Sequence, residues 1–139
     1  VAFGVHDMKV TTDFYKQLGF TDQIFESKEF FEPMAPWYQV GRPLPGHHMT
    51  LWLSGEGAGI EPVRLTPLWE DCRGEWGHVG PMDFGIGVQN IKKAVATLKE
   101  LGIETHSEIQ VLDVGNTEFK YVYFKDPDDQ YVSLVESNY

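Results

Sequence analysis

The chain contains an internal repeat, and this repeat constrains its fold more than any other feature. Residues 1–20 and 84–103 align without a gap at an offset of 83 positions. Six of the twenty aligned positions are identical, and apolar residues coincide at several others. The identical pairs are Gly4/Gly87, Val5/Val88, Lys9/Lys92, Lys16/Lys99, Leu18/Leu101 and Gly19/Gly102. Self-similarity at a fixed offset is the signature of a duplicated structural unit, so we expect two copies of one unit.

Each copy of the repeat has the pattern of a strand followed by a helix. Val1, Phe3 and Val5 alternate with small residues, which is typical of a strand. Apolar residues at helical spacing then predict helices over residues 10–18 and 91–101. A glycine directly follows each of these segments, as expected for a helix C-terminal cap.

Further strands are predicted after each helix. They cover residues 20–25, 37–40 and 47–53 in the first half, and 107–111, 118–124 and 131–136 in the second. Residues 55–82 are rich in glycine and proline and are interpreted as a packed connector. We therefore expect one domain, 1–139, made of a first module over residues 1–54, the connector, and a second module over residues 83–139.

Composition excludes several classes of function. The chain of 139 residues carries a net charge of −10, which repels phosphate backbones and anionic lipids. Neither nucleic acid nor a membrane is therefore expected as a partner, and the apolar runs are too short to span a bilayer. Cys72 is the single cysteine, which excludes an internal disulfide and favours a reducing compartment, so we expect a cytoplasmic location.

Two βαβββ units together with three local sequences resemble the vicinal oxygen chelate superfamily, which includes glyoxalase I, extradiol dioxygenases and bleomycin-resistance proteins. These sequences are VHDM at residues 5–8, FYKQLGF at residues 14–20 and FKDPDDQYVSLVE at residues 124–136. The resemblance covers nearly the whole chain. It implies an α+β fold in which two βαβββ modules form a cupped mixed sheet that holds a ligand on its concave face.

Metal-dependent members of that superfamily carry up to four His, Glu or Gln ligands on the concave face. Carried over by position, the first ligand would precede Val1, and the others fall at Trp52, Asp83 and Ser133. An indole and a hydroxyl are poor metal ligands. His48 would share a strand face with Trp52, but no histidine shows a metal-ligand spacing such as HExxH. We therefore expect no metal and no other cofactor.

Aromatic residues take the place of the metal ligands in this interpretation. Alternation along 131–136 and 118–124 places Tyr121, Tyr123 and Tyr131 on the same face as Ser133, and sends Val122, Phe124, Val132 and Leu134 toward the helices. In HHMTLWL, we expect Met49, Leu51 and Leu53 to pack under the helix and Trp52 to line the ligand face beside His48. Trp37 and Tyr38 are candidates for the rim of the pocket.

These features predict a small-molecule binding protein that resembles the drug-sequestering bleomycin-resistance proteins, and hence a role in antibiotic resistance. The ligand-binding candidates are His48, Trp52, Asp83, Tyr121, Tyr123, Tyr131, Ser133, Trp37 and Tyr38, and the expected guest is aromatic or cationic. The alternative is an enzyme of the same superfamily: a lyase, isomerase or dioxygenase with rearranged metal ligands, or a metal-free enzyme with Asp83 as general base. The resemblance also implies a homodimer.

Overall fold

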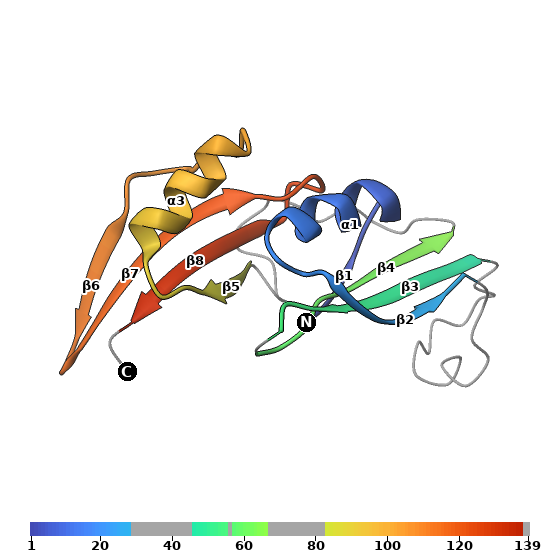
Figure 1. Ribbon diagram of the computed structural model, residues 1–139, viewed down its shortest axis with the longest axis horizontal. Coiled ribbons are helices and arrows are strands. Elements are labelled where there is room, and N and C mark those ends of the chain that lie inside the picture. The colour runs from blue at the N-terminus through green and yellow to red at the C-terminus, as the bar shows by residue number, and fades with distance from the viewer. Residues whose placement is uncertain (29–45, 56, 67–82, 138–139) are drawn as a thin grey trace. The chain divides into compact units, whose positions relative to one another are not determined.

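The chain folds into two compact units, Val1–Asp71 and Cys72–Tyr139. The computed structural model describes residues 1–28, 46–55, 57–66 and 83–137 (Figure 1). Within these residues, each unit forms a four-stranded mixed sheet and contains one helix.

The first unit has the element order strand, helix, strand, strand, strand. Its elements are β1 (Ala2–Gly4), α1 (Met8–Gln17), β2 (Asp22–Ser27), β3 (Gly46–Leu53) and β4 (Glu61–Thr66). The strand order in the sheet is β1-β4-β3-β2. Strands β1 and β4 are parallel, and the other neighbours are antiparallel.

The second unit repeats this topology strand for strand. Its elements are β5 (Asp83–Gly87), α3 (Ile91–Glu100), β6 (Gln110–Val114), β7 (Thr117–Lys125) and β8 (Tyr131–Ser137). The strand order is β5-β8-β7-β6, with β5 and β8 parallel and the other pairs antiparallel. The predicted α+β fold of two βαβββ modules is confirmed.

The 83-residue offset of the sequence repeat holds in the structure. The helices begin at Met8 and Ile91 and end at Gln17 and Glu100. Asp7 and Asn90 occupy the two N-cap positions, where each side-chain oxygen accepts backbone N–H bonds. The glycines that follow the helices have φ angles of 99° and 75°, a region that L side chains rarely adopt. Local capping chemistry therefore sets both ends of each helix.

One strand of the first unit was not predicted. Strand β4 lies within the segment interpreted as a connector, so the first unit continues past residue 54. This strand pairs with β1 on one side and β3 on the other, and is therefore interior to the sheet. The strand predicted over residues 37–40 lies outside the described residues. The last strand of the first module is thus β4, and β3 is the strand before it.

The core of the second unit follows the predicted register. The side chains that face α3 from β7 and β8 are at most 4% exposed: Val122, Phe124, Val132 and Leu134. Ile91 and Leu98 of α3 are 1% and 2% exposed and complete this core. Successive side chains of a strand point to opposite faces of the sheet. The tyrosines between these core residues therefore lie on the face opposite α3.

In the first unit, the register predicted for β3 is wrong. The face of β3 that packs under α1 carries His48, Thr50 and Trp52, while Met49, Leu51 and Leu53 lie on the other face. Two observations establish this. Lys16 of α1 lies over the Trp52 ring at 4.5 Å from its centroid. Trp52 pairs with Ile60, which is 2% exposed and shares a face with the fully buried Pro62.

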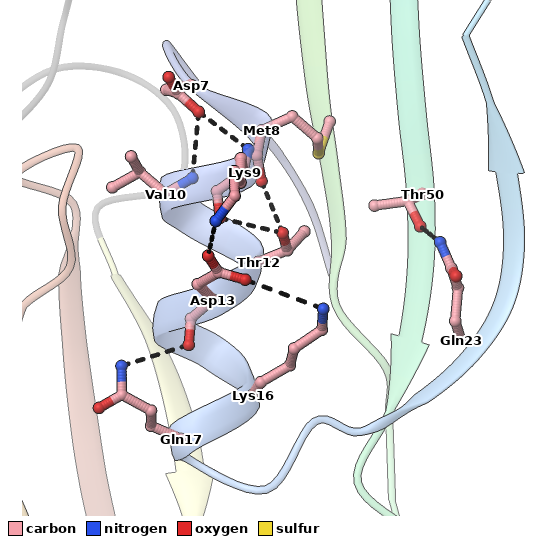
Figure 2. Close-up of polar contacts among 10 residues, drawn as sticks. All are labelled: Asp7, Met8, Lys9, Val10, Thr12, Asp13, Lys16, Gln17, Gln23 and Thr50. Atoms are coloured by element: carbon pink, nitrogen blue, oxygen red, sulfur yellow. Dashed lines mark hydrogen bonds and ion pairs between the residues drawn. The ribbon is translucent and has the colours of Figure 1, made fainter.

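This face of β3 can be buried because the hydroxyl of Thr50 finds hydrogen-bond partners within the sheet. Its hydroxyl donates to the Phe25 carbonyl oxygen at 2.8 Å. It also accepts from Gln23 Nε2 at 2.9 Å, as Figure 2 shows. A buried polar group is costly only when it lacks partners. The large indole of Trp52 then supplies apolar area beneath α1, next to buried Ile60.

Neither described helix is long and apolar enough to cross a membrane.

Candidate functional site

The face of the second sheet opposite α3 carries a compact group of polar and aromatic side chains. We call this group the tyrosine face, and it consists of Asp83, Tyr121, Tyr123, Lys125, Tyr131 and Ser133. Strand pairing fixes their positions. Asp83 pairs with Tyr131, and Tyr131 pairs with Lys125, so these three form one row across β5, β8 and β7. Ser133 and Tyr123 form the next row.

A hydrogen bond joins the acid of this face to its neighbouring strand. The Ser133 hydroxyl donates to Asp83 Oδ2 at 3.2 Å. Ser133 is 5% exposed, whereas Asp83 is half-exposed. The carboxylate is therefore held in place by one neighbour and retains acceptor capacity for a guest.

Gly85 pairs with Ser133 and lies next to this hydrogen bond. A Cβ atom at this position would lie 3.2 Å from Ser133 Oγ and 3.3 Å from Val135 Cγ2. Both contacts are tighter than ordinary van der Waals distances. Glycine at this position therefore leaves Ser133 in place to hold the Asp83 carboxylate.

The three tyrosine rings stand at steep angles to one another. The ring centroids of Tyr121 and Tyr123 are 6.0 Å apart with planes at 75°, and those of Tyr123 and Tyr131 are 6.4 Å apart with planes at 89°. These are edge-to-face contacts, which the aromatic quadrupole favours. All three side chains are half-exposed. Mutual packing thus holds the rings in defined orientations while leaving part of each ring accessible.

The hydroxyl of Tyr123 remains protonated over the physiological range. Burial raises the pKa of Tyr123 above its usual value, and the negative charge of Asp83 raises it further. Tyr123 therefore presents a neutral hydroxyl that both donates and accepts hydrogen bonds.

Two basic residues near Tyr131 were not among the predicted site residues. Lys125 Nζ lies 4.9 Å from the Tyr131 ring centroid. The rings of His106 and Tyr131 are 5.4 Å apart at 51°. The sequence signal for Lys125 is its place directly before the DPDD turn, which makes it the partner of Tyr131 in the hairpin. His106 has no such signal, because it is placed by an isolated bridge between Thr105 and Phe124.

Two predicted site residues do not lie on a ligand face. Trp52 packs beneath α1, and its Nε1 is buried without a hydrogen-bond partner among the described residues. His48 lies on the same side of the first sheet, where its Nε2 is 2.8 Å from Glu26 Oε1. Both assignments are corrected by the register of β3. The predicted rim residues Trp37 and Tyr38 lie outside the described residues.

Solved structures of glyoxalase-family proteins are similar to this chain along nearly its whole length. The glyoxalase family protein from Bacillus cereus aligns with a TM-score of 0.75 and 17% identity, over 99% of this chain and 91% of its own. That from Enterococcus faecalis aligns at 0.70 and 22%, over 98% and 94%. A member of the glyoxalase/bleomycin resistance protein/dioxygenase superfamily from Sphaerobacter thermophilus aligns at 0.64 and 23%, over 98% and 93%.

The fold is that of the vicinal oxygen chelate superfamily. No protein-family model matches the sequence, and neither does any curated protein. At these identities, the likeness establishes the vicinal oxygen chelate fold, and the chemistry must come from the side chains.

The topology corrects one of the metal-ligand positions that the resemblance implies. The fourth position, Ser133, lies on the last strand of the second unit and pairs with Gly85. Gly85 is equivalent to Ala2 at the offset of 83, and Ala2 pairs with Glu61 on the last strand of the first unit. The position equivalent to Ser133 is therefore Glu61 and not Trp52. Pairing of Phe3 with buried Pro62 places Glu61 on the face opposite α1.

The donors on the tyrosine face do not fit a transition-metal site of the vicinal oxygen chelate type. Asp83 supplies one carboxylate, and the hydroxyl of Ser133 is already bonded to it. Such a site needs three or more carboxylate, imidazole or thiolate ligands. Within the described part of the chain, no group of three or more His, Cys, Asp or Glu side chains is placed to hold an ion.

Proposed function

We propose that this protein binds a small planar aromatic molecule that carries a positive charge, and that it acts by sequestering this molecule in the cytoplasm. The observation that carries the proposal is the tyrosine face itself, where three tyrosines with defined ring orientations share one face of the sheet with the half-buried carboxylate of Asp83. The guest would stack on the accessible rings and direct its cationic group to Asp83.

The energies of such contacts are sufficient for useful affinity. A stacking or cation–π contact contributes about 0.5–2 kcal/mol when partly desolvated. Three tyrosine contacts would together contribute about 1.5–6 kcal/mol, and about 4 kcal/mol corresponds to a Kd of about 1 mM. The net charge of −10 supports the same guest, because it raises the local concentration of cations.

Binding of a dye tests the proposal directly. A planar cationic acridine or phenanthridine dye should bind the parent protein with saturable changes in dye fluorescence. Tyr123→Leu should weaken that binding about tenfold by removing the central ring. Tyr123→Phe keeps the ring and should bind within about threefold of the parent. Equal affinity of all three proteins, or no saturable binding, would contradict the proposal.

A resistance phenotype would follow from sequestration. Expression of the protein in a drug-sensitive bacterium should raise the inhibitory concentration of a planar cationic antibiotic in proportion to the protein level. The same expression of Tyr123→Leu should protect less, because a sequestering protein acts by stoichiometric binding.

An enzyme of the same superfamily is the alternative, and Glu61 is the observation that favours it. Its carboxylate occupies the position that metal-dependent members use for a ligand, by equivalence with Ser133. Asp83, bonded to Ser133, would alternatively serve as a general base without a metal. Elemental analysis that finds near-stoichiometric Zn, Ni, Fe or Mn after dialysis, and its loss in Glu61→Ala, would favour the metal-dependent enzyme.

We also propose a homodimer, as the resemblance implies. Sedimentation velocity at micromolar concentration should give the mass of two chains. A mass of one chain across the accessible concentration range would contradict this part of the proposal.

A further inference from the structure

The tyrosine face carries opposite charges on the two sides of one ring. Tyr131 lies in the middle of a row, with Asp83 paired to it on β5 and Lys125 paired to it on β7. All three side chains lie on the face opposite α3. Because neighbouring strands are about 4.8 Å apart, the acid and the base are attached to the sheet about 10 Å from each other.

The ammonium of Lys125 is directed over this ring and is available to a guest. Its Nζ lies 4.9 Å from the Tyr131 centroid. Its carboxylate neighbour, Asp129, lies at 3.8 Å, near the outer limit of an ion pair, and the Asp129 side chain is 69% exposed. Pairs of this kind contribute little and exchange readily with solvent ions.

His106 adds a second basic group on the side of Tyr131 away from Asp83. Its ring lies 5.4 Å from that of Tyr131. Its backbone N–H donates to the Tyr123 carbonyl oxygen at 2.8 Å, which fixes the segment next to the tyrosine face. Lys125 therefore supplies positive charge at one end of the row, and Asp83 supplies negative charge at the other end.

We infer that the guest is amphoteric: a planar aromatic body with a cationic group that pairs with Asp83 and a carboxylate or similar anion that pairs with Lys125. This inference rests on the proposed function and narrows its ligand class. A guest with positive charge alone would stack equally well, but it would bring no partner to Lys125 and would be repelled by it. Unpaired and like charges of this kind are how a site discriminates against a near relative of its ligand.

A matched pair of dyes separates this inference from the proposed function. A rhodamine with a free carboxyl group and its methyl ester share the planar cation and differ only in the anion. Fluorescence anisotropy titrations would use the parent full-length chain, Lys125→Gln, Asp83→Asn, and Lys99→Gln as a control lysine on the exposed surface of α3.

The expected results form a specific pattern. The parent should bind the carboxyl dye at least about tenfold more tightly than the ester, which corresponds to about 1.4 kcal/mol. Lys125→Gln should abolish this preference by weakening the carboxyl dye alone. Asp83→Asn should weaken both dyes, and Lys99→Gln should behave as the parent does.

Each other result has a definite meaning. Equal affinity of the parent for the two dyes, or equal loss of both in Lys125→Gln, would overturn the amphoteric guest and leave the binding function standing. Failure of both dyes to bind would overturn the binding function and this inference with it.

Discussion

The ammonium group of Lys16 lies 4.5 Å from the ring centroid of Trp52, which places this tryptophan in the core of the first unit beneath α1. Trp52 is 9% exposed. The sequence predicted that Trp52 lines a ligand face. In the fold, however, its neighbours Ile60 and Thr50 are core residues. Its role is therefore expected to be in stability.

Trp52→Ala should lower the free energy of unfolding of the protein by about 3–5 kcal/mol, because it removes a large buried ring and leaves a cavity. Denaturant melts followed by far-UV circular dichroism measure this change. Trp52→Phe keeps most of the apolar volume and should cost clearly less. A variant that kept the parental midpoint but lost dye binding would show instead that Trp52 contacts the ligand.

The two N-caps offer a matched test of the duplication. Asp7 accepts hydrogen bonds from Lys9 N at 2.9 Å and Val10 N at 3.0 Å, as Figure 2 shows, and Asn90 accepts one from Lys93 N at 2.9 Å. Asp7→Ala and Asn90→Ala should each cost about 0.5–2 kcal/mol in urea melts.

The larger of the two effects is expected for Asp7→Ala, because Asp7 caps two N–H groups and adds negative charge at the helix N-terminus. Serine at either position retains a capping oxygen and should restore most of the loss. Parental stability in both alanine variants would argue against the observed helix starts.

Gly85 and Gly87 form a second matched pair. Gly85→Ala would push against Ser133 Oγ and Val135 Cγ2, whereas a Cβ at Gly87 meets nothing within 4 Å. We expect Gly85→Ala to displace Ser133, weaken its bond to Asp83 and reduce dye affinity several-fold. Gly87→Ala should leave affinity unchanged. Titrations of both variants with one dye decide the question, and equal affinities would show that Gly85 has no role in shaping the site.

Glu136 should make the stability of the protein depend on pH. Its carboxylate accepts from the Ile91 N–H at 2.6 Å and from Lys120 Nζ at 2.9 Å, and these bonds hold the pKa of Glu136 below its usual value. The unfolded chain has a Glu pKa of about 4.3. Because the folded pKa is lower, Glu136 stabilises the folded state above pH about 4.3, and this stabilisation is lost as the pH falls through the folded pKa.

The measurement is a comparison of urea midpoints for the parent and Glu136→Gln between neutral and acid pH. The parent should be more stable at pH 7, and the difference should shrink as the solution is acidified. Glu100→Gln, at the exposed end of α3, serves as the control. A difference that stays constant with pH would exclude a charge-dependent role for Glu136.

The sequence by itself determined the duplication, the approximate extent of each helix, and the strand face that carries Tyr121, Tyr123 and Tyr131. Helix ends are local, since Asp7, Asn90 and the two following glycines act within a few residues of themselves. The tyrosine face was predictable because tyrosine or polar residues alternate with apolar residues over 121–125 and 131–134. Only one register buries the apolar set under α3, namely Val122, Phe124, Val132 and Leu134.

The tertiary structure alone decided the register of β3 and the position equivalent to Ser133. One alternating set of β3 contains Met49, Leu51 and Leu53, and the other contains the large indole of Trp52. Alternation shows which residues share a face, but it does not show which face lies under the helix. That choice depends on Gln23 and the Phe25 carbonyl, which satisfy the buried Thr50 hydroxyl from another strand. It also depends on Ile60, which bridges to Trp52 and directly precedes β4, a strand that was not predicted. Contacts between distant segments supply this energy, and no local pattern contains it.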